Sequence, residues 1–154
     1  MASAMVHELN TFGLQAHAAE ASNSPPPENY DAFVIGSPLY GGKWIPVAGL
    51  YAALMAKRIK KKPVALFSMG GLSIKHPEAG LAQHKEFLKN LIEIAPSLNV
   101  VSDAVFTGYF ERSNLPWYLK IVDRFAPTPQ GDHRDWPKIQ IWSRSLVTKF
   151  GLTQ

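Results

Sequence analysis

The sequence contains no cysteine among its 154 residues. This absence excludes disulfides, thiolate metal sites, iron–sulfur ligation and cysteine catalysis, and it fits a reducing cytoplasm, where we expect the protein. Long apolar runs are also missing, because none approaches the roughly 20 residues of a membrane-spanning helix. The first twelve residues lack the basic and apolar regions of a secretory signal.

Familiar catalytic motifs are absent as well. Neither glycine-rich nucleotide loop, G-x-G-x-x-G or G-x-x-x-x-G-K-[ST], occurs. A nucleophile elbow at Ser68 would need glycine two residues earlier, where Leu66 stands. The five histidines are scattered and no carboxylate pair stands out, so we predict neither a catalytic side chain nor a metal site. The run 132–135 (DHRD) suggests a metal or a helix-capping turn, and the turn is favoured. A bound cofactor would account for this poverty of reactive side chains.

The composition is that of an ordinary globular chain, with 46% apolar and 18% charged residues. Its length fits one domain over residues 1–154 with a sizeable core. Much of the net charge of +4 comes from one cluster, Lys57, Arg58, Lys60, Lys61 and Lys62. The cluster either forms a solvated helix end, where cations suit the dipole, or contacts anionic lipid or an acidic protein. Nucleic acid is not expected, because no aromatic residues are interleaved with the charges.

Hydrophobic periodicity predicts strands that alternate with helices, the pattern of a parallel sheet with helices on both faces. In the helix at 46–58 we expect Val47, Leu50, Leu54 and Met55 to form the buried stripe. The predicted helices are 2–12, 46–58, 77–94, 115–125 and 135–150, and the predicted strands are 14–19, 31–35, 63–68 and 100–107.

The chain is organised around residues 30–44 (YDAFVIGSPLYGGKW). An apolar strand at 31–35 ends at Gly36, and a loop over 37–44 then leads to a helix that starts at Pro46. Ligands of open α/β sheets bind at the carboxyl ends of strands. The two aromatic rings and two glycines of this loop suit a flat conjugated ligand. The alternative is a tight turn with Trp44 in the core.

Three further segments sharpen this pattern: Phe106–Tyr109 (FTGY), Trp117–Tyr118 (WY) and Gly131–Trp136 (GDHRDW). Together with GSPLYGG at 36–42, they resemble the flavodoxin-domain family that includes menaquinone-dependent protoporphyrinogen dehydrogenase. The resemblance covers nearly the whole chain. It implies a flavodoxin-like, doubly wound parallel sheet of order 2-1-3-4-5 that holds FMN noncovalently.

By this resemblance, Tyr40 and Trp44 stack on or flank the isoalloxazine, and Gly41 and Gly42 adjust to its N5 edge. A cation at Lys43 would raise the flavin midpoint potential, since it favours the anionic reduced form. The implied cofactor contacts are Ser37, Pro38, Leu39, Tyr40, Gly41, Gly42, Lys43 and Trp44 in a first loop, and Met69, Gly70 and Gly71 in a second.

The implied activity is an FMN-dependent oxidoreductase or electron-transfer protein that works with a redox partner. Its full-length form would oxidise a porphyrinogen and pass the electrons to a quinone. The alternative is a flavin-free binding or scaffold domain in which the same loops contact a protein. We also expect a membrane- or quinone-facing surface at the inner membrane face, aided by the Lys57–Lys62 cluster. That surface comprises Trp117, Tyr118, Leu119, Ile121 and Val122.

The sequence departs from the family pattern at its N-terminus. The family begins with a strand and a phosphate-binding loop, whereas Met1 here already adjoins the first helix. The strand at 33–35 should therefore have an unpaired edge in the middle of the sheet. Without the phosphate loop, we expect FMN to bind weakly or not at all. A shortened chain, a degenerate relative or a partner that supplies a strand would each explain the departure, and we favour the first.

Overall fold

A computed structural model describes residues 1–40, 42–59, 61–114, 117–125, 127 and 129–152, with the backbone alone for residues 72, 75, 114, 118, 119 and 122. Its main sheet has the order β2-β1-β3-β4. The strands are β1 (Phe33–Tyr40), β2 (Lys43–Trp44), β3 (Pro63–Met69) and β4 (Asn99–Phe106). β1, β3 and β4 run parallel, and β2 folds back antiparallel on the end of β1. This arrangement confirms the predicted α/β class with a parallel sheet.

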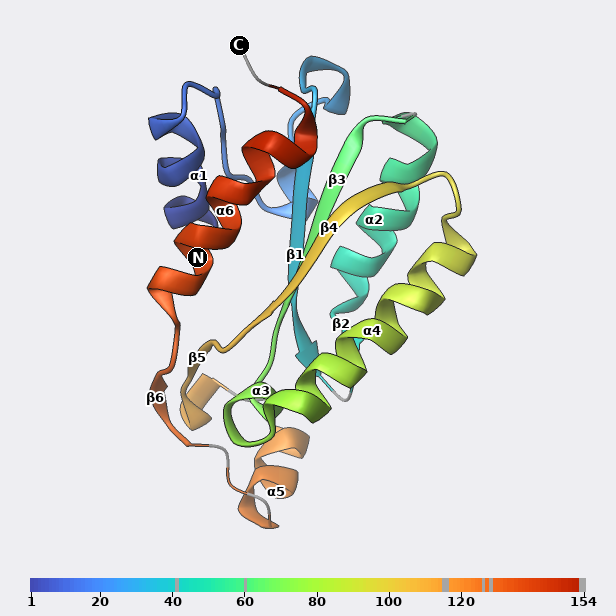
Figure 1. The fold of residues 1–154 in the computed structure, drawn as a ribbon. Helices are drawn as coiled ribbons and strands as arrows, with labels where there is room; N and C mark the ends of the chain where they lie inside the picture. The colour runs from blue at the N-terminus through green and yellow to red at the C-terminus, as the bar shows by residue number, and fades with distance from the viewer. Residues whose placement is uncertain (41, 60, 115–116, 126, 128, 153–154) are drawn as a thin grey trace.

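Helices cover both faces of the sheet (Figure 1). On one face lie α1 (Ala2–Thr11) and α6 (Trp136–Phe150), and on the other lie α2 (Pro46–Arg58) and α4 (Pro77–Ile94). The remaining elements are η1 (Ala21–Asn23), η2 (Pro27–Asn29), α3 (Leu72–Lys75), β5 (Tyr109–Phe110), η3 (Arg112–Asn114), α5 (Trp117–Phe125) and β6 (Gly131–Asp132).

The core is built on β3, which is flanked by β1 and β4. Residues 64–68 of β3 are all buried, as expected of a strand covered on both faces. Val64 and Leu66 pack toward α2 and α4, while Ala65 and Phe67 pack toward α1 and α6. The alternation along one strand therefore supplies both halves of the core.

The buried side of α2 differs from the prediction. Its buried residues are Ala48, Ala52, Met55 and Ala56, and only Met55 belonged to the predicted stripe. Val47, Leu50 and Leu54 are instead 47%, 62% and 53% exposed. The predicted stripe was built on large aliphatic residues, whereas this helix turns its small side chains to the sheet.

Residues 14–19 were predicted as a strand, and this prediction was wrong. The segment has no regular secondary structure, and within the described chain no backbone–backbone hydrogen bond reaches residues 15–19. A strand needs a partner ladder, and the nearest strand, β1, does not pair with this segment. Over Phe33–Pro38, β1 pairs with β3 on one side only, which confirms the expected unpaired edge.

The basic cluster belongs to the end of α2. Arg58 forms an ion pair of 2.8 Å with Glu28, and Lys62 Nζ donates to the carbonyl oxygens of Glu28 and Tyr30. Arg58 and Lys62 thus stabilise the segment at residues 28–30 that precedes β1. Lys60 lies outside the described residues. In Figure 1, this end of α2 and α5 lie at opposite ends of the sheet, so the expected joint surface of cluster and α5 is wrong. Tyr118, Leu119 and Val122 of that surface have side chains outside the described part.

Among the described residues, no helix is long and apolar enough to cross a membrane.

Candidate functional site

The central segment continues as a strand beyond its predicted end. β1 runs to Tyr40 and forms a hairpin, in which Leu39 pairs with Trp44 and Tyr40 with Lys43. Gly42 has φ +77°, a left-handed conformation that suits glycine in a tight turn. The predicted open loop at 37–44 was therefore wrong over most of its length, because residues 37–40 extend β1 and Lys43–Trp44 pair with its end. Gly41 lies outside the described residues.

The carboxyl ends of the parallel strands meet at one edge of the sheet. A Cβ at Gly70 would lie 3.6 Å from Leu39 Cβ, and a Cβ at Gly108 would lie 3.8 Å from Met69 Cβ. The Gly70 N–H donates to the Phe106 carbonyl oxygen at 3.3 Å. The segments that follow β1, β3 and β4 are thus adjacent, and the two predicted loops lie close together. This edge is the candidate site.

The predicted site residues differ in their access to this edge. Tyr40 is 48% exposed and Lys43 is exposed, so both can reach a ligand. Pro38, Gly42, Met69, Gly70 and Gly71 are half-buried. Ser37 and Leu39 are buried, at 1% and 8% exposure, so they present almost no surface to a ligand.

Trp44 belongs to the core. Its ring stacks on Phe87 with centroids 4.7 Å apart, and its Nε1 donates to Ser68 Oγ at 2.7 Å. With 5% exposure, it presents no open face to a ligand. This position corrects the expectation that Trp44 flanks a flavin and matches the alternative in which the ring packs in the core.

A buried polar network that was not predicted from the sequence lies beneath the site. Ser68 Oγ lies 2.7 Å from His84 Nδ1, and His84 Nε2 lies 3.3 Å from Asp103 Oδ2. A proton on His84 Nε2 would let each group donate to the next, starting from Trp44. Ser68 and His84 are both 0% exposed, so the network has the members of a catalytic triad without access to substrate. The signal was the spacing of Gly80, His84, Leu88 and Leu91, which share the buried face of α4.

Burial lowers the pKa of His84, while the Asp103 carboxylate acts in the opposite direction. The imidazole is therefore held in its neutral form, which both hydrogen bonds of the network accommodate.

The GDHRDW segment is a structural turn, as predicted. Asp132 accepts hydrogen bonds from the Arg134 side chain and backbone N–H, which hold the pKa of Asp132 at about 2. The Arg134 guanidinium lies 4.5 Å from the Trp136 ring centroid, and Asp135 caps α6 by accepting from the Lys138 N–H. Within the described chain, no group of three metal-ligating side chains occurs.

Tyr109 adds a second exposed aromatic ring beside the strand ends. It lies in β5, which pairs with β6, and its side chain is 55% exposed. Its hydroxyl donates to Glu111 at 2.8 Å, and this bond raises the pKa of Tyr109. Tyr109 belongs to the FTGY segment of the resemblance but was not among the predicted site residues.

One buried hydroxyl next to the second loop lacks a partner. Within the described part of the chain, Ser73 Oγ is the buried side-chain polar atom for which no hydrogen bond is found. It lies 3.8 Å from where a Cβ at Gly70 would stand, and 2.2 Å from a Cβ at Gly80. The hydroxyl is thus closed to solvent and packs against Gly80 of α4.

Comparison with known proteins gives a family match. The sequence model of a protein family described as "Flavodoxin domain" matches residues 1–135. A flavoprotein from Lactobacillus acidophilus NCFM, crystallised in complex with FMN, is similar at 26% identity and a TM-score of 0.41. The similarity covers 54% of this chain and 48% of that one, so the chain spans about half the length of that flavoprotein. No curated protein matches the sequence.

Proposed function

Because this chain belongs to the flavodoxin-domain family, we propose that it binds FMN at the carboxyl edge of its sheet and serves in electron transfer. The observation that carries the proposal is the meeting of Leu39, Gly70 and Gly108 at one edge. Bound FMN would supply one- and two-electron chemistry. The chain itself supplies binding, orientation and charge.

The residues at this edge fit the ring of a flavin. Tyr40 and Tyr109 offer exposed aromatic faces, and Gly70 and Gly71 place no side chains at this edge. Lys43 is exposed and would place a cation near the ring. Lys43 would favour a reduced, anionic flavin and so raise its potential.

The phosphate of FMN is the weaker part of the fit. The start of α1 has unpaired N–H groups, as every helix start has, but the described residues place no hydroxyl-rich loop beside it. We therefore expect binding that rests mainly on the ring. Loss of two or three charge-assisted hydrogen bonds would weaken binding by about three to six orders of magnitude.

Titration with FMN and with riboflavin, followed by flavin fluorescence, tests the proposal. We expect weak binding of both, with similar affinities, because riboflavin lacks only the phosphate. Tyr40→Ala should weaken both, whereas Phe12→Ala should not, since Phe12 is as exposed but lies at the far end of α1. Absence of binding at millimolar flavin would contradict the proposal and favour a flavin-free binding domain. Much tighter binding of FMN than of riboflavin would show that other residues hold the phosphate.

We further propose that the substrate is a porphyrinogen and the electron acceptor a quinone. The segments that carry this resemblance, Phe106–Tyr109, the start of α5 and Gly131–Trp136, gather around the same edge of the sheet. Appearance of porphyrin fluorescence, dependent on both FMN and quinone, is the expected result. A flavin-loaded protein that reduces quinone without oxidising a porphyrinogen would contradict this substrate.

A further inference from the structure

The outer face of α2, formed by Val47, Leu50 and Leu54, is apolar although it is open to solvent. These side chains are each about half exposed, while the side chains that α2 buries are mainly alanines. A surface helix normally has the reverse arrangement, with large apolar residues inside and polar residues outside. Between Pro46 and Ala56 the helix contains no charged residue. Exposed apolar side chains that gather on one helix face are typical of an interaction surface.

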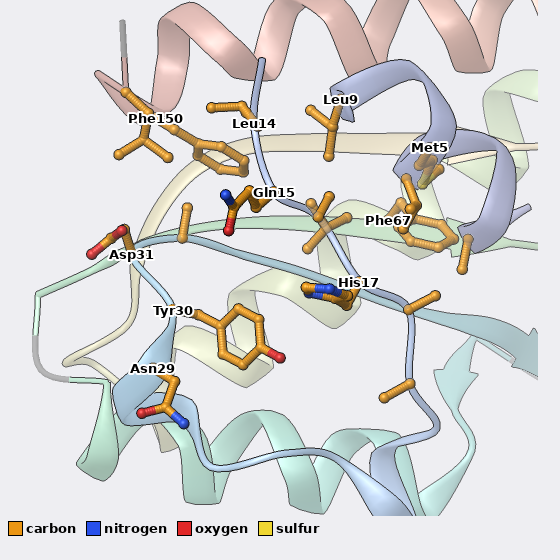
Figure 2. Close-up of a pocket in the computed structure, with 18 of the residues that line it drawn as sticks. Met5, Leu9, Leu14, Gln15, His17, Asn29, Tyr30, Asp31, Phe67 and Phe150 are labelled. Carbon is orange, nitrogen blue, oxygen red and sulfur yellow. The ribbon is translucent and has the colours of Figure 1, made fainter. Parts of the chain in front are cut away.

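The outer face of α2 is separate from the cavities beside β1. One cavity, of about 870 Å³, has walls that combine apolar side chains with polar ones such as Gln15, His17 and Tyr30 (Figure 2). A smaller cavity of about 170 Å³ reaches α2 at Ala48 and Tyr51, on another side of the helix. The three residues of the outer face line neither cavity, so this face is an open surface of its own.

A notch lies next to Leu50 on α2. A Cβ at Gly49 would meet no atom of the described chain within 4 Å, apart from its chain neighbours and the backbone of the helix. Ala53, one turn further along α2, is also small. The side chains of a helix form ridges that pack into grooves of this kind. The shape of the surface therefore suits a partner helix.

The exposed charges that follow the outer face along the chain are positive. Lys57 and Lys61 are exposed, and within the described chain neither forms an ion pair. Their neighbours are already engaged, since Arg58 pairs with Glu28 and Lys62 donates to backbone carbonyl oxygens. Carboxylates of a partner would therefore meet two unpaired cations beside an apolar surface.

From these observations we propose that the outer face of α2 binds an acidic amphipathic helix of another protein. The apolar side of that helix would pack on Val47, Leu50 and Leu54. Its carboxylates would pair with Lys57 and Lys61. Val47 and Lys57 lie about 15 Å apart along the axis of α2, so a partner helix of three to four turns spans the apolar surface and the cations.

Two other occupants fit this surface less well. In a pair of identical copies about a two-fold axis, the cations at the end of α2 would face either each other or the start of the second α2. The helix dipole is positive at that start, and Lys43 is exposed beside it, so like charges would meet in both cases. A membrane has the complementary negative charge, but helices that lie in its interface carry aromatic anchors, and Val47, Leu50 and Leu54 include none.

Binding of designed peptides to the full chain, measured by fluorescence anisotropy, tests the proposal. The probe is fluorescein-AELEAELEELAEELE-amide, an acidic helix with leucines spaced three and four residues apart. One control peptide has lysine in place of each glutamate, and the other has alanine in place of each leucine. We expect a dissociation constant of about 10–100 µM for the probe, because the surface is smaller than a standard interface. Both control peptides should bind roughly tenfold more weakly or not at all.

A matched pair of variants locates the apolar contact. Leu50→Ser should weaken binding of the probe roughly tenfold or more, whereas Ile141→Ser should leave it unchanged. The two side chains are 62% and 66% exposed but lie on opposite faces of the sheet. In the parent chain, the probe should shift amide resonances along residues 46–61, which maps the contact without any substitution.

A second pair of variants tests the charges. Lys57→Gln with Lys61→Gln should weaken binding of the probe about fivefold. Lys85→Gln with Lys89→Gln removes the same charge from exposed positions of α4 and should have no effect.

Three results would overturn the proposal directly: no binding at millimolar probe, equal binding of the probe and the lysine peptide, or equal effects of Leu50→Ser and Ile141→Ser. Binding to phosphatidylglycerol vesicles that Leu50→Ser removes would overturn it in favour of lipid. Self-association that Leu50→Ser removes would overturn it in favour of a second copy. The proposed flavin site plays no part in these results.

Discussion

His84 lies in a position where its charge is coupled to folding. Its imidazole is fully buried between Ser68 and Asp103, and burial lowers its pKa. In the unfolded chain the same group titrates near its ordinary value of about 6.5. Between these two pKa values the unfolded state binds more protons, so stability must rise with pH in that range.

We predict that the free energy of unfolding decreases as the pH falls from 7.5 to 5. Denaturant titrations across this range should show the loss, and His84→Gln should reduce its pH dependence because the titrating group is gone. His7→Gln, at an exposed position of α1, is the matched control and should keep the parent slope. An unchanged slope in His84→Gln would show that other groups cause the acid sensitivity.

α5 carries the most exposed large apolar side chains near the candidate site. Trp117, Ile121 and Phe125 are 75%, 52% and 84% exposed and recur every four residues, which places them on one side of the helix. Lys120 and Arg124 lie on the same helix and are exposed. An apolar stripe beside cations is typical of helices that lie in a membrane interface.

We predict that this stripe binds anionic vesicles. The parent chain should co-sediment with vesicles that contain phosphatidylglycerol, less so at high salt, and the double change Trp117→Ser with Phe125→Ser should remove the binding. Leu50→Ser with Leu54→Ser removes two exposed apolar side chains from α2 and should have no effect. If both double variants bind alike, α5 is not the contact.

At the level of elements, the helices and strands with a continuous apolar face could be predicted from the sequence. The run Pro63–Met69 and the helices at 2–11, 77–94 and 136–150 follow from hydrophobic pattern and capping, since Asp135 does cap α6. The hairpin at Tyr40–Lys43 was missed, because Pro38 and two glycines also indicate a loop. The predicted strand at 14–19 failed because strand formation depends on a partner, which no local pattern reveals.

The two loops of the candidate site were predicted to meet at one edge of the sheet, and the structure brings them together there, whereas their contact with a flavin stays a prediction. The position of the predicted loops 37–44 and 69–71 at one edge could be derived, because it depends only on the parallel direction of the two strands that precede them. The burial of Trp44 could not, because it depends on Phe87 and Ser68, residues far away in sequence. His84 escaped notice for the same reason, since its two partners come from two different strands.

At the scale of the whole molecule, the sheet is supported unevenly. β3 is paired on both sides, whereas β1 is paired on one side along Phe33–Pro38. In a parallel pair, alternate residues of a strand direct their N–H groups to opposite sides. We therefore predict that about half of the β1 amides exchange much faster than those of β3 in the unliganded chain, as measured residue by residue. Uniform slow exchange along β1 would show that its edge is already covered in solution.

The contact between Gly36 and Phe67 has a consequence for how β1 can move. The two residues face each other across the pair, and a Cβ at Gly36 would stand 2.0 Å from the tip of the Phe67 ring. If β1 slid by one residue along β3, Ile35 or Ser37 would bring its side chain into the space that the ring fills. Glycine at position 36 therefore fixes the register of the two strands, because only this residue leaves room for the Phe67 ring. The register of β1 on β3 is thus fixed, and the free edge of β1 keeps a constant position along the sheet.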